Sequence, residues 1–245
     1  MEPASIHKLF KIRAFTALAS LLLSAFAYYS NDIINSDGIL YMGMAEAYAK
    51  GGLTAMMEYT SFNWPFFPIL VAYFHQITSF PLETSAYILN GLLFILLLDA
   101  LILISRKLQL NSQQLAIAAL LFICFQSFNE YRDFIIRDFG YWAFSALTLY
   151  RFIQFIEKPT IANATFWQIV AITAVLFRVE GIAILLGLPF YLFINYAPKV
   201  AVKQYFKLNY LLILGVAVTT GLVVEMSGVT AAFSKITTVT KYISP

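Results

Sequence analysis

The sequence predicts an all-α, polytopic membrane protein, and two observations carry that prediction. Hydrophobic residues make up 60% of the 245 residues, whereas charged residues make up only 12%. The mean hydropathy of +0.76 is far above that of a soluble domain of this length. Apolar runs also recur along the chain, as helices that cross a bilayer in series require. We therefore expect a single transmembrane domain over residues 1–245.

Apolar length places the spans, because a helix needs about 20 largely apolar residues to cross the hydrocarbon core. About seven segments qualify on this basis. The predicted spans are residues 14–29, 85–104, 115–128, 139–156, 166–177, 182–196 and 208–224. The fifth and sixth are short and meet at residues 178–181. Such a pair indicates tilted neighbours or two helices that meet at a break within the bilayer.

Basic residues in short loops predict the orientation of the spans. They precede the first and seventh predicted spans and follow the second and fourth, so alternating spans bring them to one side. These residues are His7, Lys8, Lys11, Arg13, Arg106, Lys107, Lys158, Lys199, Lys203 and Lys207. The N-terminus is then cytoplasmic. The loops at 31–68 and 129–138, the corner at 178–181 and the C-terminal tail fall on the non-cytoplasmic face.

Two apolar segments have alternative interpretations. The first predicted span ends in Ala25-Phe26-Ala27, which resembles a signal-peptidase site, but the following series of spans favours a retained anchor. The segment 64–79 carries Pro65 and Pro68 and is too short and too broken to span. We expect it to form a helix that lies at the membrane interface.

Charge and cysteine content exclude several classes of site. The formal net charge is only +3, and the basic residues form no stripe, so no nucleic-acid-binding surface is expected. The one cysteine, Cys124, excludes an intrachain disulfide and a cysteine-cluster metal site. Because it lies in an apolar run, we expect it to fill the core.

The most informative segment is the first external loop, residues 31–68, which includes an interfacial helix. Ser36 is predicted to cap a helix that begins near Asp37 and ends at Gly51 and Gly52. Spacings of three and four residues place Asp37 and Tyr41 on one face of this helix, together with Met44 and Tyr48. The alternative is an amphipathic surface helix in which Asp37 only complements the helix dipole.

Several motifs, in this order, resemble the start of the GT-C membrane glycosyltransferases. They are Ser36-Asp37-Gly38-Ile39-Leu40-Tyr41, an alanine-rich helix that ends in Gly51-Gly52, Asn63-Trp64-Pro65-Phe66-Phe67-Pro68-Ile69-Leu70, and Phe177-Arg178-Val179-Glu180-Gly181-Ile182. The last of these is similar to the Thr-Arg-Pro-Glu-Gly corner of that group. The group includes the dolichyl-phosphate-mannose protein mannosyltransferases and the lipid A aminoarabinose transferases, and the resemblance covers residues 15–193.

The resemblance implies a polyprenyl-phosphate sugar donor, a cavity at the outer membrane face and a catalytic carboxylate on the first external loop. Asp37 matches that carboxylate by position, with Asp32 as the alternative. It would take the proton from the acceptor hydroxyl in an inverting transfer, while cationic groups hold the leaving phosphate. Tyr41 would contact the substrate beside it.

One departure from the group concerns a second acid. Related sequences often carry an acid just before the proline pair, where this chain has Asn63-Trp64. Glu58 is the nearest carboxylate and the candidate for that role. The sequence therefore assigns no metal ligands, and a divalent cation held between two acids stays open.

The second external loop repeats an arginine–aspartate pair. Arg137 and Asp138 fall at the membrane boundary, where the guanidinium suits a phosphate and the carboxylate can orient it. Arg132 and Asp133 are interpreted as an ordinary ion-paired loop.

Three further charged residues lie within or between apolar runs. Burying such a charge costs roughly 2.5–3.5 kcal/mol on insertion scales. We expect Arg178 to point into the outer cavity and pair with a lipid phosphate, while Glu180 neutralises it. Asp99 is interpreted as structural, reaching toward Arg106 and Lys107 or a polar group on a neighbouring helix.

The predicted function is transfer of a sugar from a polyprenyl-phosphate donor to a lipid, glycan or protein acceptor at the non-cytoplasmic face of the inner or plasma membrane. One alternative is a transporter or flippase, which would hold its charges near the midplane and show a repeated half. Another is a non-catalytic subunit of a glycan-assembly complex. Because the chain stops at Pro245, just after the last predicted span, we interpret it as a fragment or a short variant.

Overall fold

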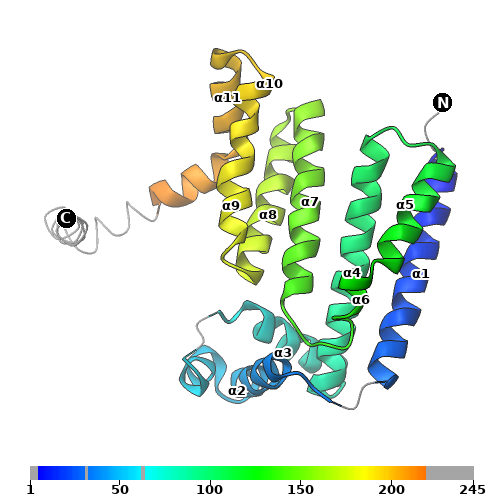
Figure 1. Cartoon of the computed structure of the whole chain (residues 1–245). Helices are drawn as coiled ribbons and strands as arrows, with labels where there is room; N and C mark the ends of the chain where they lie inside the picture. Colours follow the sequence, from blue (N-terminus) through cyan, green and yellow to red (C-terminus); the bar gives the residue numbers. More distant parts are fainter. Residues whose placement is uncertain (1–4, 31–32, 62–63, 219–245) are drawn as a thin grey trace, which may run out of the picture.

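The computed structural model describes residues 5–30, 33–61 and 64–218. These residues form helices joined by short turns, with no strand among them, so the all-α prediction is confirmed. Four long helices run side by side in the order α1 (Ile6–Ser30), α4 (Leu82–Lys107), α7 (Asp138–Glu157) and α8 (Ile161–Phe177) (Figure 1). The N-terminal end of α1 lies at the opposite end of this layer from α2 and α3 (Figure 1).

Within the described ranges, two helices are long and apolar enough to cross a membrane, namely α1 and α4. The prediction of about seven continuous spans is therefore supported at two positions. At the other predicted spans, the helices are shorter or more polar. For example, α8 has 17 residues and α5 (Ser112–Cys124) has 13.

The predicted span 115–128 does not form one helix. A capping box starts α5, because the Asn111 side chain accepts from the backbone N–H of Gln114 at 3.0 Å and the Gln114 side chain accepts from that of Asn111 at 3.1 Å. The helix ends at Cys124 because Phe125 is extended, with φ −65° and ψ 110°. The four-residue α6 (Gln126–Asn129) follows. Cys124 itself is exposed, so the expectation that it fills the core is wrong.

The predicted span 182–196 is also divided. It consists of α9 (Gly181–Gly187), the 3-10 helix η1 (Leu188–Tyr191) and α10 (Leu192–Asn195). Pro189 lies at the start of η1 and has no N–H to donate, so the continuous α-helical ladder cannot pass through it. Next comes α11 (Pro198–Leu208), and a further helix covers 210–218. The rest of the last predicted span lies outside the described residues.

The described part of the segment predicted as the first external loop, residues 31–68, is helical for most of its length. Its first helix, α2 (Ser36–Tyr59), is interrupted at Gly52, which has φ 71° and ψ −159°. A Cβ placed on Gly43 would lie 2.1 Å from the hydroxyl of Tyr59, so the chain turns back at Gly52 and the two halves of α2 lie against each other. The predicted helix break is thus confirmed at Gly52. The predicted Ser36 cap is wrong by one residue, because Asn35 occupies the N-cap.

The helix predicted over 64–79 is present as α3 (Phe66–Thr78). It packs on α2 and α4, where Tyr41 and Phe67 make an edge-to-face contact at 5.4 Å. Tyr48 of α2 also donates a hydrogen bond to the Tyr73 hydroxyl of α3 at 3.1 Å. Together α2 and α3 close one end of the four-helix layer (Figure 1).

An aromatic core lies where α4, α7 and α8 meet α3. Phe94 packs on Phe139 at 5.2 Å, and Phe66 packs on Phe177 at 5.0 Å. Gly140 makes room for this core, since a Cβ there would lie 2.1 Å from the Phe177 ring. Outside the core, α1 exposes large apolar side chains such as Phe10, Phe15 and Phe26. A lipid-facing surface has this character.

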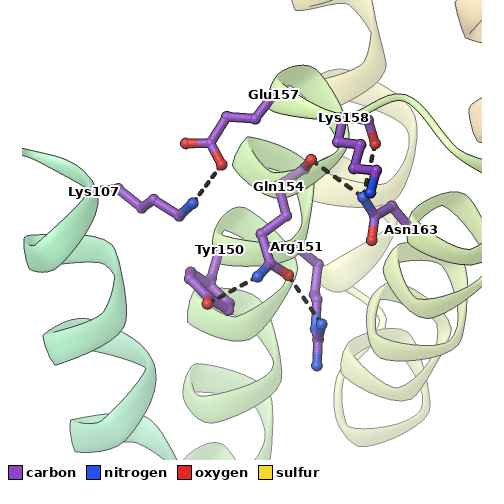
Figure 2. A network of polar contacts seen from close by, with 7 residues as sticks. All are labelled: Lys107, Tyr150, Arg151, Gln154, Glu157, Lys158 and Asn163. Carbon is purple, nitrogen blue, oxygen red and sulfur yellow. Dashed lines mark hydrogen bonds and ion pairs between the residues drawn. The ribbon is translucent and has the colours of Figure 1, made fainter. Parts of the chain in front are cut away.

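Asp99 is a structural group, as predicted, and its partner is on a neighbouring helix. The Asp99 carboxylate on α4 receives two hydrogen bonds from Arg13 on α1, from Nε at 2.5 Å and from Nη2 at 2.8 Å. Lys107 instead forms an ion pair with Glu157, which joins α4 to α7 (Figure 2).

Candidate functional site

The loop between α6 and α7 is held in place by hydrogen bonds from two other elements. Tyr87 and Asn90 of α4 donate to the backbone carbonyls of Asp133 and Phe134, both at 3.0 Å. On the other side, the Asn35 side chain accepts from the Ile135 backbone N–H at 2.9 Å and donates to its carbonyl at 3.3 Å. These bonds fix the start of α7 beside the start of α2.

A cavity of about 360 Å³ opens between these two helix starts. It is lined by Asn35, Ser36, Asp37, Tyr131, Phe134, Ile136, Asp138 and Trp142. Two carboxylates therefore face one space, Asp37 from the first turn of α2 and Asp138 from the first turn of α7. The aromatic walls offer faces on which a sugar ring can stack.

Arg178 holds the second of these carboxylates. Its Nη1 forms an ion pair with Asp138, while Nη2 and Nε donate to the two oxygens of Glu180 at 2.6 and 3.2 Å. The pKa of Glu180 falls to about 2, chiefly because its carboxylate accepts from Arg178. The same hydrogen bond is the main cause that raises the pKa of Arg178. Arg178 and Glu180 are therefore both charged at neutral pH.

Tyr41 connects the cavity with this ion-pair cluster. Its side chain is buried, and its phenol interacts electrostatically with Arg137, Asp37, Asp138 and Arg178. Burial is the main cause that raises its pKa to about 12. The phenol therefore keeps its proton at neutral pH and can donate a hydrogen bond.

The corner after α8 depends on a glycine. A Cβ on Gly181 would lie 2.7 Å from the backbone nitrogen of Val175 and 2.8 Å from the carbonyl carbon of Ala174, so a side chain does not fit there. Trp64 adds a bond at the same end of α8, where its Nε1 donates to the Leu176 carbonyl at 2.7 Å. Trp64, which with Asn63 occupies the place where GT-C sequences often carry a second acid, thus anchors the segment before α3.

The structure brings together six of the seven residues that the sequence selected. They are Asp37, Tyr41, Arg137, Asp138, Arg178 and Glu180. Glu58 is separate, because it lies beyond the break at Gly52, is exposed and does not line the cavity. The second carboxylate of the cavity is Asp138 instead. The alternative base, Asp32, lies outside the described residues.

Sequence reasoning missed two kinds of contributor. Tyr131 and Trp142 form a wall of the cavity, with ring centroids 6.3 Å apart, but aromatic residues are too common in this chain to mark a site. Asn35 orients the loop through a contact 100 residues away in sequence. No local signal predicts such a contact.

Arg132 is buried, with 7% of its surface exposed, and forms no ion pair with Asp133, so the ordinary-loop interpretation is wrong for it.

Across the described ranges, no three His, Cys, Asp or Glu side chains cluster closely enough to hold a metal ion.

A second polar network lies at the opposite end of the layer and connects helices (Figure 2). Gln154 of α7 donates to the Tyr150 hydroxyl at 2.9 Å and accepts from Arg151 at 2.9 Å. Asn163 of α8 donates to the Lys158 carbonyl at 2.7 Å and closes the turn between α7 and α8. Because these contacts hold helix ends in place, we interpret this network as structural. We therefore assign the candidate site to the Asp37 cavity instead.

Comparison with protein-family models, curated proteins and solved structures gives no match to this chain. The GT-C resemblance therefore stands on its motifs alone, and the candidate site stands on the geometry described above.

Proposed function

We propose that this protein is an integral-membrane glycosyltransferase that transfers a sugar from a polyprenyl-phosphate donor to an acceptor hydroxyl at the non-cytoplasmic face. One observation supports this most directly. Asp37 and Asp138 line the same cavity, and Arg178 forms an ion pair with Asp138 beside it. A base and a phosphate-binding cation would need this proximity to act on one glycosyl phosphate.

The two carboxylates have different roles in this proposal. Asp138 is paired with Arg178 and its side chain is only 20% exposed, so it positions the arginine. Asp37 is exposed at the cavity and is the general base. In the reaction, the acceptor oxygen forms a bond to the anomeric carbon, the bond from that carbon to the phosphate oxygen breaks, and Asp37 takes the acceptor proton. The polyprenyl phosphate leaves with the bonding electron pair.

The leaving phosphate is bound by Arg178 with help from Arg137. Glu180 is half-exposed, so the incoming phosphate replaces it on the outer side of Arg178 while the less exposed Asp138 stays in place. Arg137 precedes Asp138 and adds a second positive charge near the cluster. The planar guanidinium suits this exchange, because it can bind carboxylate and phosphate in the same forked geometry.

The proposal includes an orientation in the membrane. Two helices with membrane-spanning length and composition, α1 and α4, support a membrane location. We place the N-terminus in the cytoplasm and the Asp37 cavity outside, in an inner or plasma membrane with about seven passes, on the basis of the basic residues in short loops.

The test uses the purified chain in nanodiscs with a panel of decaprenyl-phosphate hexoses and pentoses and an alkyl glycoside as acceptor. Asp37→Asn should lower transfer at least about 100-fold, because a general base contributes at least that factor. Glu46→Gln is the matched control, since Glu46 lies on the same helix and pairs with Lys50 at 2.6 Å away from the cavity. Near-normal transfer by Asp37→Asn would remove the base assignment. Movement of the lipid across the bilayer without transfer of sugar would identify a transporter instead.

A further inference from the structure

Arg132 is a buried cation whose hydrogen-bond partners within the described ranges are all neutral. Its side chain reaches from the loop before α7 to α1, where Nη1 donates to the Ser24 hydroxyl at 2.8 Å and to the Ser20 carbonyl at 3.1 Å. Its Nε donates to the Asn129 side chain at 2.5 Å, and the guanidinium lies 3.8 Å from the centre of the Phe94 ring. None of the described residues accepts from Nη2.

Among the described residues, no carboxylate forms an ion pair with this guanidinium. Only 7% of the Arg132 surface is exposed. A buried charge is costly unless an opposite charge and hydrogen bonds compensate it, and buried polar atoms normally have a partner. Hydroxyls, an amide and an aromatic face compensate part of this cost. An anionic group would compensate the rest.

Arg132 also lines a cavity of about 720 Å³, twice the volume of the Asp37 cavity. The lining residues are Leu23, Phe26, Ala27, Ser30, Ile123, Cys124, Asn129, Glu130, Arg132 and Asp133. None of them lines the Asp37 cavity, so the two spaces are distinct. The α1 wall is mostly apolar, and Leu23 and Phe26 are exposed on it. An acyl chain can lie along such a wall.

The same cavity carries negative charge near its arginine. Glu130 is exposed and receives a hydrogen bond at one carboxylate oxygen, from Gln126 at 2.8 Å. Asp133 also lines the cavity. A ligand that brings only an anion would meet repulsion from these carboxylates. A ligand that carries a phosphate and an amine a few bonds apart is complementary to both signs.

We propose that this cavity binds a phospholipid with an amine-bearing head group, such as phosphatidylethanolamine. The phosphate lies against the Arg132 guanidinium, and the ammonium lies toward Glu130 and Asp133. The acyl chains follow the apolar side chains of α1. This site binds a lipid from the surrounding bilayer and is independent of the proposed sugar transfer.

The chain provides its own reporter for this site. Cys124 is the one cysteine of the sequence, is exposed and lines the cavity. We expect phosphatidylethanolamine to slow the alkylation of Cys124 by N-ethylmaleimide in delipidated, detergent-purified protein by at least about fivefold, because a bound lipid shields the thiol. Phosphatidylcholine, whose quaternary amine cannot donate hydrogen bonds, and phosphatidylglycerol, which has no amine, should protect less. Equal protection by all three lipids, or protection by none, would overturn the proposal.

Variants separate the head group contacts from general folding. Lipid binding is measured by native mass spectrometry. Arg132→Gln should weaken phosphatidylethanolamine binding at least about tenfold, Arg132→Lys less, and Glu130→Gln about threefold. Arg106→Gln, at the far end of α4, is the control and should bind as the parent does. If Arg132→Gln does not fold, Glu130→Gln and the alkylation of the parent protein still decide the question. Soluble glycerophosphoethanolamine that protects Cys124 as well as the lipid does would overturn the assignment of a membrane lipid.

Discussion

The guanidinium of Arg178, at the end of α8, pairs with the carboxylate of Asp138, in the first turn of α7 and 40 residues earlier in the chain. The same guanidinium donates to both oxygens of Glu180. One cation thus fixes the corner between α8 and α9 and the direction of a carboxylate that lines the candidate cavity. The contact unites two motifs that the sequence presents as separate.

Replacing Arg178 should affect both stability and phosphate binding. Arg178→Gln leaves the little-exposed Asp138 carboxylate without its cation, so we expect a lower melting temperature. The double variant Arg178→Gln/Asp138→Asn should recover part of this loss, with a coupling energy of about 0.5–3 kcal/mol. A thermal-unfolding double-mutant cycle measures it. Additive losses would show that the pair is not coupled.

The phosphate role of Arg178 has its own readout. Decaprenyl-phosphate binding in nanodiscs should weaken by about 1.5–3 kcal/mol in Arg178→Gln, the range for hydrogen bonds to charged groups. Arg178→Lys should retain part of the affinity because it keeps the charge but not the fork. Folded variants that both bind as the parent does would make Arg178 a purely structural cation.

The Arg178–Glu180 pair predicts a loss of stability in acid. Arg178 lowers the pKa of Glu180 from 4.5 to about 2. A folded-state pKa below the unfolded value gives stabilisation that is present above about pH 4.5 and lost as the pH falls toward about 2. The difference in melting temperature between the parent and Glu180→Gln should therefore be large at about pH 7 and small at about pH 3. The corresponding difference for Gly140→Ala, which changes no titratable group, should not follow this course. An unchanged Glu180→Gln difference would contradict the ion pair.

Packing at Gly140 predicts a destabilising substitution. A Cβ there would lie 2.1 Å from the Phe177 ring, so Gly140→Ala should cost about 1–3 kcal/mol of unfolding free energy through overpacking. Gly187→Ala is the matched control, because a Cβ at that helical position would meet nothing within 4 Å beyond its chain neighbours and its own helix backbone. Adding Phe177→Leu to Gly140→Ala should restore part of the loss. Equal stability of the two alanine variants would refute the close approach of α7 and α8.

The proposed orientation predicts the result of reporter fusions. Fusions after Arg106, Lys158 and Lys199 should report a cytoplasmic location, because basic residues in short loops stay on that side. Fusions after Gly51 and Asp133 should report an external location. A cytoplasmic signal after Gly51 would place the Asp37 cavity on the wrong face for a lipid-linked donor outside.

The sequence alone predicted the helical class, the helix break at Gly52, the helix within 64–79 and the two carboxylates of the candidate cavity, Asp37 and Asp138. These features are local. Apolar length, helix-forming residues and glycine act within a few turns of the chain, and a chain this apolar satisfies its backbone groups within helices.

Only the tertiary structure decided which charges meet. It paired Arg178 with Asp138 and Arg13 with Asp99, buried Arg132 among neutral partners, and left Glu58 outside the cavity. It also exposed Cys124 and ended α5 at that residue. Each outcome depends on how helices far apart in sequence pack together. The energy of a charge is set by the partners and the dielectric around it, and neither can be deduced from its neighbours in the sequence.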